Sequence, residues 1–145
     1  MPVVDYGALP EFPMRPGITG KWIASRERGA AGVGVLANTI EAGCGAPLHR
    51  HEYEEIILVE AGKIWVEMDK VRTTATPGQC VIIPANAAHA WGNDGPEVLK
   101  VLFVWNSPEP NGTGLPWPLI QAISSGMVLA GTAGRTTKAL ATEPI

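Results

Sequence analysis

Short apolar segments separated by glycine and proline recur along this chain at intervals of about ten residues. Several of them are rich in β-branched or aromatic residues, and the apolar repeat that marks a helix is scarce. Residues 98–105 form the longest apolar candidate strand, and a Pro-Gly turn signal at 77–78 precedes another. Such a pattern predicts an all-β sandwich or small barrel. The strands that we expect are residues 32–40, 55–59, 64–68, 79–83 and 98–105.

The segments 55–59 and 64–68 are separated only by the sequence Glu-Ala-Gly-Lys. In the second segment Ile64, Val66 and Met68 alternate with Trp65 and Glu67, which indicates a strand with one buried face. A short connection that contains glycine is typical of a β-hairpin. We therefore predict that these two segments pair with each other.

The length of 145 residues suits one domain with a substantial core, and a hydrophobic content of 46% argues against a disordered chain. Four prolines in the first twenty residues predict an extended arm or edge strand, which we expect to cover the sheet edge of a neighbouring subunit. The expected organisation is an N-terminal arm and edge strand (residues 1–30), a β-barrel (31–108) and a C-terminal segment (109–145). The last of these is expected to hold a short helix at residues 119–124 and a loose tail.

The net charge is −3, with 11 basic and 14 acidic residues distributed without runs. No basic stripe is available to neutralise phosphates, so nucleic acid is not an expected partner. No apolar run approaches the roughly 20 residues that span a bilayer, and the first residues do not resemble a secretory signal. Cys44 and Cys80 stand apart without metal-binding spacing. We expect a reduced, cytoplasmic protein that does not bind membranes.

All three histidines of the chain lie in two short segments. His49 and His51 are two residues apart, so in an extended chain both rings point to the same side, and Glu55 follows four residues later. His89 lies in the second segment. Three imidazoles and one carboxylate suit a divalent transition metal, namely Fe, Mn, Ni, Co or Zn, and would leave positions on an octahedral ion open to other molecules. A structural zinc site would more often use thiolates and close its coordination shell.

The two histidine segments resemble the two conserved motifs of the cupin superfamily. The first motif, G(X)5HXH(X)3–4E(X)6G, is matched by Gly43, His49, His51, Glu55 and Gly62. The second, G(X)5PXG(X)2H(X)3N, is matched by Gly78, Pro84, His89 and Asn93. One position departs from the family, because Asn86 occupies the place of a glycine. Asparagine tolerates a positive φ better than most residues, so a tight turn can still form there.

The resemblance implies an antiparallel double-stranded β-helix, the jelly-roll barrel of the cupins, with one metal ion per chain in its interior. His49, His51, Glu55 and His89 carry over as the metal ligands. Gly43, Gly62 and Gly78 carry over as turn residues. Because single-domain cupins commonly pair, we also expect a homodimer.

Aromatic residues near the motifs are candidates for the wall of a substrate cavity. Trp91 lies two residues after His89 and should share its face of the strand. The other candidates are Tyr53, Trp65, Phe103 and Trp105, for which packing in the core is an equally good interpretation. Glu54 and Arg50 should point away from the ligands, into solvent. The strand interiors supply almost no Arg or Lys, so the cavity is expected to be apolar and to take a small hydrophobic or aromatic molecule.

The function that we expect is that of a metal-dependent oxidoreductase, an Fe(II)-type dioxygenase in which substrate and O2 bind side by side. No catalytic residue beyond the metal ligands can be identified from the sequence. A non-redox lyase, isomerase or polyketide-type cyclase, with the metal as a Lewis acid, is the alternative. The polyketide-cyclising cupins that this chain resembles in size use a fourth histidine where Glu55 stands. A cupin that binds a small molecule without converting it is the second alternative.

Overall fold

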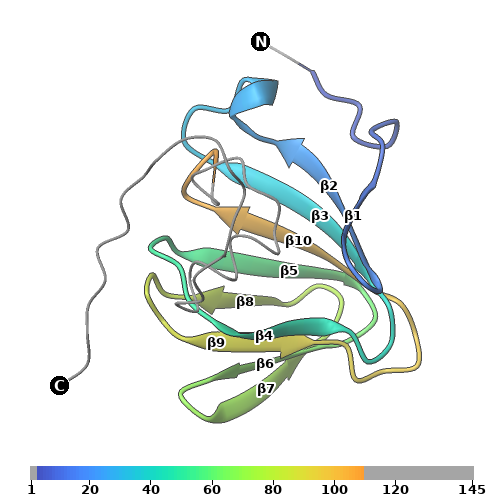
Figure 1. The fold of residues 1–145 in the computed structure, drawn as a ribbon, viewed down its shortest axis with the longest axis vertical. Coiled ribbons are helices and arrows are strands. Elements are labelled where there is room, and N and C mark those ends of the chain that lie inside the picture. Colours follow the sequence, from blue (N-terminus) through green and yellow to red (C-terminus); the bar gives the residue numbers. More distant parts are fainter. Residues whose placement is uncertain (1–2, 110–145) are drawn as a thin grey trace, which may run out of the picture.

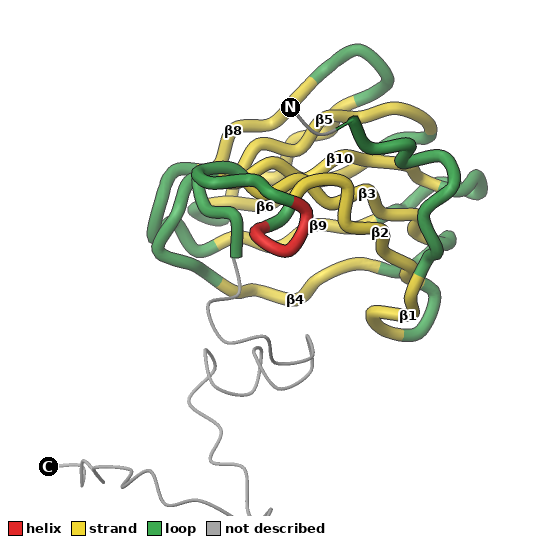
Figure 2. Tube along the Cα trace, turned by 90° about the horizontal axis from the view of Figure 1, so that it is seen from above, coloured by secondary structure: helices red, strands yellow, loops and turns green. Residues whose placement is uncertain are grey.

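The computed structural model describes residues 3–109 of the chain, which form two antiparallel β-sheets that pack face to face (Figure 1). The six-stranded sheet has the order β1 (Phe12–Arg15), β2 (Ile18–Ala24), β3 (Gly34–Ile40), β10 (Leu99–Trp105), β5 (Glu55–Ala61) and β8 (Cys80–Ile83). The four-stranded sheet has the order β4 (Gly45–His49), β9 (His89–Gly92), β6 (Ile64–Met68) and β7 (Val71–Ala75). Seen from above, β5 and β8 lie on one side and β4 on the other (Figure 2).

The all-β jelly-roll prediction is confirmed for the described residues, whose helical structure is limited to the 3-10 turn Arg26–Arg28. The expected helix at 119–124 and the loose tail lie outside these residues. Alternate positions of the strands face the space between the sheets. On β3 and β10 the inward set comprises Leu36, Asn38, Ile40, Leu99, Val101, Phe103 and Trp105, each at most 7% exposed. The core therefore lies between the two sheets.

The predicted strands correspond to β3, β5, β6, β8 and β10, but the predicted hairpin is wrong. β5 pairs with β10 and β8 in one sheet, whereas β6 pairs with β7 and β9 in the other. The connection crosses the sandwich at Gly62, whose φ of +76° is a left-handed conformation. Each of the two strands must bury one apolar face between the sheets. This requirement decides which strands they pair with, although the connection is short enough for a hairpin.

The proline-rich N-terminal segment has a place in the sheet of its own chain. β1 pairs with β2, and β2 pairs with β3, so that β1 becomes one edge of the six-stranded sheet. The Arg15 side chain, at the end of β1, donates a hydrogen bond from Nη1 to the carbonyl oxygen of Gly45 (2.9 Å). This bond connects the edge of one sheet to the first residue of β4 in the other.

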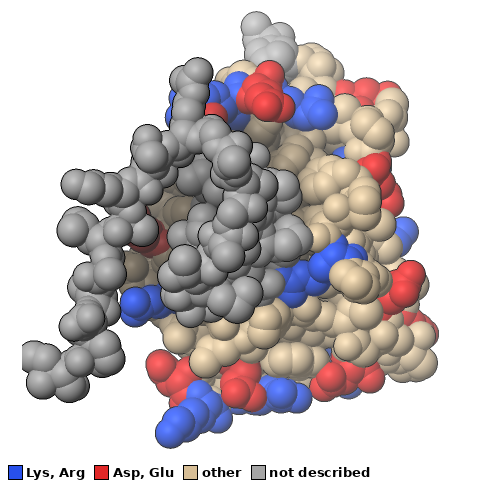
Figure 3. Space-filling model, viewed as in Figure 1, with Lys and Arg blue, Asp and Glu red and all other residues tan. Residues whose placement is uncertain are grey.

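On the face shown in Figure 3, acidic and basic side chains are interspersed along the edges of the described surface, with neutral atoms between them. No helix among the described residues is long and apolar enough to cross a membrane.

Substitution of Gly62 tests the crossover between the sheets. A Cβ there would lie 2.8 Å from the carbonyl oxygen of Val98 and 2.9 Å from Cα of Leu99, both backbone atoms. Gly43 is a matched control, because its φ is also +76° but a Cβ there meets nothing within 4 Å. We expect Gly62→Ala to lower the free energy of unfolding by about 1–3 kcal/mol more than Gly43→Ala does. Urea unfolding followed by circular dichroism measures both, and equal losses would contradict the crossover.

Candidate metal centre

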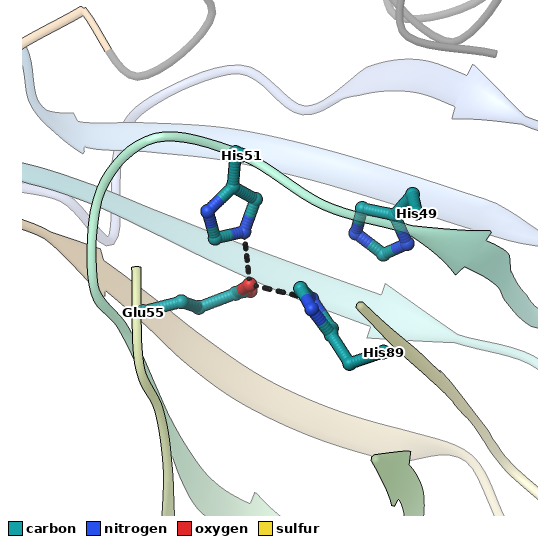
Figure 4. A group of neighbouring side chains, drawn as sticks. All are labelled: His49, His51, Glu55 and His89. Atoms are coloured by element: carbon teal, nitrogen blue, oxygen red, sulfur yellow. Dashed lines mark hydrogen bonds and ion pairs between the residues drawn. The ribbon is translucent and has the colours of Figure 1, made fainter. Parts of the chain in front are cut away.

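The four predicted metal ligands converge in the structure from both sheets (Figure 4). His49 is the last residue of β4 and lies opposite His89, the first residue of β9, in the register of the four-stranded sheet. His51 follows two residues after His49, just beyond the strand. Glu55 is the first residue of β5 in the six-stranded sheet. One donor atom from each side chain lies within 4.8 Å of the others, so the group could hold a metal ion.

Each of the three imidazoles is oriented by a backbone carbonyl group two residues away. Nδ1 of His49 lies 2.7 Å from the oxygen of Pro47, Nδ1 of His51 lies 2.8 Å from that of Tyr53, and Nδ1 of His89 lies 2.9 Å from that of Ala87. A carbonyl oxygen only accepts hydrogen bonds, so each Nδ1 must carry the proton. The Nε2 atoms are thereby assigned as the ligating atoms, in the arrangement usual for metal-binding histidines.

The Glu55 carboxylate lies between two of these Nε2 atoms. Its Oε2 is 2.7 Å from Nε2 of His51 and 3.1 Å from Nε2 of His89. Neighbouring ligands of an octahedral ion with bonds of roughly 2.1 Å are separated by about 3 Å, so these distances suit coordination. Without an ion such contacts require a proton on Nε2, which a bound metal would replace. Glu55 is 2% exposed and His89 0%, and a carboxylate so deeply buried needs a positive partner.

The pKa values in the cluster follow from burial and from these contacts. Burial, and after it repulsion from His89, lowers the pKa of His49 to about 4, so this ring is neutral at physiological pH. Burial alone would raise the pKa of Glu55. The hydrogen bonds from His51 and His89 have the larger effect and lower this pKa. Burial also disfavours the charged form of His89, yet the hydrogen bond to Glu55 raises its pKa overall. An ionised carboxylate beside a neutral imidazole is the donor set that a cation requires.

A tight turn between β8 and β9 holds the two histidine segments together. The backbone N–H of Asn86 donates to the carbonyl oxygen of His51 (2.7 Å), and that of Ala87 donates to the oxygen of Pro84 (3.1 Å). Asn86 has a φ of +64°, which confirms the expectation that it takes the left-handed conformation of the family glycine. The carbonyl of Ala87 then orients His89. The positive φ of Asn86 thus helps to position ligands from both motifs.

Three of the five aromatic candidates line a cavity beside the cluster. Trp91, Phe103 and Trp105 form part of its wall together with His49, His51 and Glu55. The rings of Phe103 and Trp105 are stacked, with centroids 5.6 Å apart, and the Trp91 ring lies 5.1 Å from Phe103. The cavity volume is ≈ 30 Å³, room for about two water molecules. It therefore accommodates a very small molecule or one end of a larger one.

Tyr53 and Trp65 are not among the residues that line this cavity. Tyr53 stacks on the His51 ring with centroids 4.6 Å apart, and burial raises its pKa to about 12. Trp65 lies between the buried residues Ile64 and Val66 of β6 and so faces the other side of the sheet. There the guanidinium of Arg72 lies 3.9 Å from the centre of a Trp65 ring. Trp65 is therefore part of the outer surface.

Sequence reasoning missed three polar or polarisable residues of the cavity wall, Met14, Arg15 and Asn38. Arg15 corrects the expectation that almost no Arg or Lys points inward, and partial burial lowers its pKa. Its place could not be foreseen because the N-terminal arm was expected to lie against a neighbouring subunit, whereas β1 joins the sheet of its own chain. The inward position of Asn38 could have been predicted, because it lies two residues from Leu36 and from Ile40 in a strand whose alternate residues are buried. Arg50 and Glu54 are exposed, as expected.

Comparison with known proteins identifies a family for most of the described barrel. The sequence model of the family described as "Cupin domain" matches residues 38–105. No curated protein sequence matches the chain at a significant level.

Many solved structures share the fold, and the three described next are at most 21% identical to this chain. The polyketide cyclase RemF from Streptomyces resistomycificus is 19% identical, with a TM-score of 0.64 over 72% of this chain and 78% of that one. KdgF from Halomonas sp. is 19% identical, with a TM-score of 0.61 over 71% and 90%. A cupin-superfamily sugar phosphate isomerase from Silicibacter pomeroyi is 21% identical, with a TM-score of 0.60 over 72% and 75%. At these identities the likeness is one of fold.

Proposed function

We propose, from the premise that this chain carries a domain of the cupin superfamily, that it is a metal-dependent enzyme acting on a small, largely apolar molecule. The observation that carries the proposal is the orientation of the three imidazoles. Their Nδ1 atoms are all held by backbone carbonyls, and Nε2 of His51 and of His89 contacts the Glu55 carboxylate. The cluster forms part of the wall of a cavity with three aromatic side chains. A metal held here would face a binding site and not a closed core.

Within this class we propose an Fe(II)-type dioxygenase. When bound, iron(II) would supply electron transfer between a substrate and dioxygen. Four protein donors leave positions on an octahedral ion for both molecules. The chain contributes the negative charge of Glu55, which offsets part of the charge of the ion. The aromatic wall of Trp91, Phe103 and Trp105 limits the access of water to the site.

Lewis-acid chemistry is the second candidate. A lyase, isomerase or cyclase would use the same four ligands with zinc, nickel or manganese, and would need no dioxygen. It is favoured by two of the structures with this fold, which are a polyketide cyclase and a sugar phosphate isomerase. A binding protein without turnover would use the same cavity.

Nitric oxide, which mimics dioxygen, tests the proposal without a known substrate. We expect the protein purified without added metal to contain iron, measured by elemental analysis. After anaerobic reconstitution with Fe(II), nitric oxide should produce the EPR signal of a high-spin iron–nitrosyl, and the His51→Ala protein should give none. Tightly bound zinc, with no nitrosyl signal after iron loading, would reject the dioxygenase and leave Lewis-acid chemistry. Failure to bind any divalent metal would reject both.

A further inference from the structure

Three polar side-chain atoms of residues that line the cavity are buried without a hydrogen-bond partner. They are Nε1 of Trp91, Nε1 of Trp105 and Oδ1 of Asn38. The three residues are 4%, 7% and 4% exposed and come from three different strands, β9, β10 and β3. All three line the cavity that His49, His51 and Glu55 also line. The three residues that carry these atoms therefore meet at one cavity, beside the candidate metal centre.

Packing alone does not account for these residues. A buried N–H without an acceptor costs free energy, and native proteins contain few such groups. Phe103 contacts both indoles and shows that an aromatic ring without a polar atom fits this wall. Phenylalanine at the two tryptophan positions would supply a similar apolar ring without that cost. The indole N–H groups thus indicate a molecule that brings acceptor atoms into the cavity.

The chemistry of the wall specifies that molecule. An indole nitrogen only donates, so Trp91 and Trp105 require acceptors. The Asn38 amide group donates through Nδ2 to Sδ of Met14 (3.1 Å), which leaves Oδ1 to accept a hydrogen bond from a ligand hydroxyl. The guanidinium of Arg15 in the same wall adds positive charge, while one of its N–H groups binds Gly45. This combination favours an oxygen atom with negative charge.

We propose that Asn38, Trp91 and Trp105 form a subsite for the oxygen-bearing end of the substrate. The group that it takes is a carboxylate or polarised carbonyl, with a neighbouring hydroxyl directed to Asn38. Identifying this ligand as the substrate rests on the function proposed above. The cavity volume of ≈ 30 Å³ suits such a group, whereas it is too small for an aromatic ring without rearrangement. The subsite refines the expectation of an apolar cavity.

The test is an NMR titration of the indole Nε1–H resonances with acetate and glycolate, on both the zinc-loaded and the metal-depleted full chain. We expect the Trp91 and Trp105 resonances to shift, and the outward-facing Trp65 resonance to stay in place. Glycolate, which adds a hydroxyl, should bind more tightly than acetate. Trp91→Phe and Trp105→Phe should each weaken binding by about 3- to 10-fold. Asn38→Leu, of similar size, should abolish the preference for glycolate.

Xenon binding and the metal-depleted protein distinguish failure of the subsite from failure of the proposed function. If xenon enters the cavity while neither carboxylate shifts Trp91 or Trp105, the cavity is purely apolar and the subsite is rejected. If acetate binds only with zinc present and the two phenylalanine variants bind it unchanged, the carboxylate is a metal ligand, and the subsite fails while the metal-dependent function stands. If zinc does not bind but the two indole resonances still shift with acetate, the proposed function fails and the subsite stands.

Discussion

Replacing His51 with alanine should remove the bound metal and leave a folded barrel. The His51 ring is 14% exposed and lies beyond the end of β4, so its loss removes a ligand without opening the core. We expect the affinity for zinc or iron(II) to fall by more than about 100-fold, because even loss of an outer hydrogen-bond partner of a ligand costs 10- to 100-fold. Competition with a chromogenic chelator measures the affinity, and circular dichroism measures the fold.

Two adjacent glutamates provide the matched control for this experiment. Glu55 is 2% exposed and contacts two of the imidazoles, whereas Glu54 is exposed. Glu55→Gln should therefore weaken metal binding strongly, and Glu54→Gln should leave it unchanged. Equal effects of the two substitutions would show that the ligand set is wrong. If His51→Ala unfolds the chain when the metal is lost, the site is structural and not catalytic.

Replacing Phe103 with alanine should cause the largest loss of stability in the barrel. The ring is 2% exposed and packs against Trp91 and Trp105. Its removal leaves a void that the two sheets cannot close, and the free energy of unfolding should fall by about 3–5 kcal/mol. Urea unfolding of the metal-depleted protein, followed by circular dichroism, measures this loss without the contribution of the metal.

The neighbouring residue of β10 is the control. Leu102 faces the opposite side of the same strand and is partly exposed, so Leu102→Ala should cost distinctly less than Phe103→Ala. Phe103→Leu should recover much of the loss, because the core tolerates apolar replacements of similar size. A loss of less than about 1 kcal/mol for Phe103→Ala would contradict the packing described for this wall.

Only the first two ligands of the metal cluster could be predicted from local geometry, and the other two followed from the resemblance to the cupin motifs. His49 and His51 need only two residues of extended chain to face the same side, and the spacing of both motifs identifies Glu55 and His89. The strands were predictable for the same reason, since alternation and turn residues are short-range signals. The positive φ of Asn86 also followed from the residue type and its motif position.

Pairing between distant segments could not be predicted in this way. The alternating pattern of residues 64–68 predicts a strand but does not identify its partners, and the short connection at Gly62 suggested the wrong one. The contribution of Arg15 to the cavity depends on the pairing of β1 with β2, which the prolines did not reveal. The outward position of Trp65 could have been predicted from the sequence. It shares its side of β6 with Glu67, which indicated the solvent face, whereas Trp91 shares its side with His89.

The candidate ligands belong to different sheets, and this has a mechanical consequence. The three histidines lie on or next to the four-stranded sheet, whereas Glu55 begins a central strand of the six-stranded one. An ion bound to all four is a cross-link between the two halves of the sandwich, and the halves could not separate at that end without releasing it. A substrate larger than the cavity could therefore not enter by separation of the two sheets at that end, and a side chain of the wall would have to move instead. Met14 of the edge strand β1 is an unbranched side chain in this wall, and such a side chain can adapt its conformation to a larger molecule.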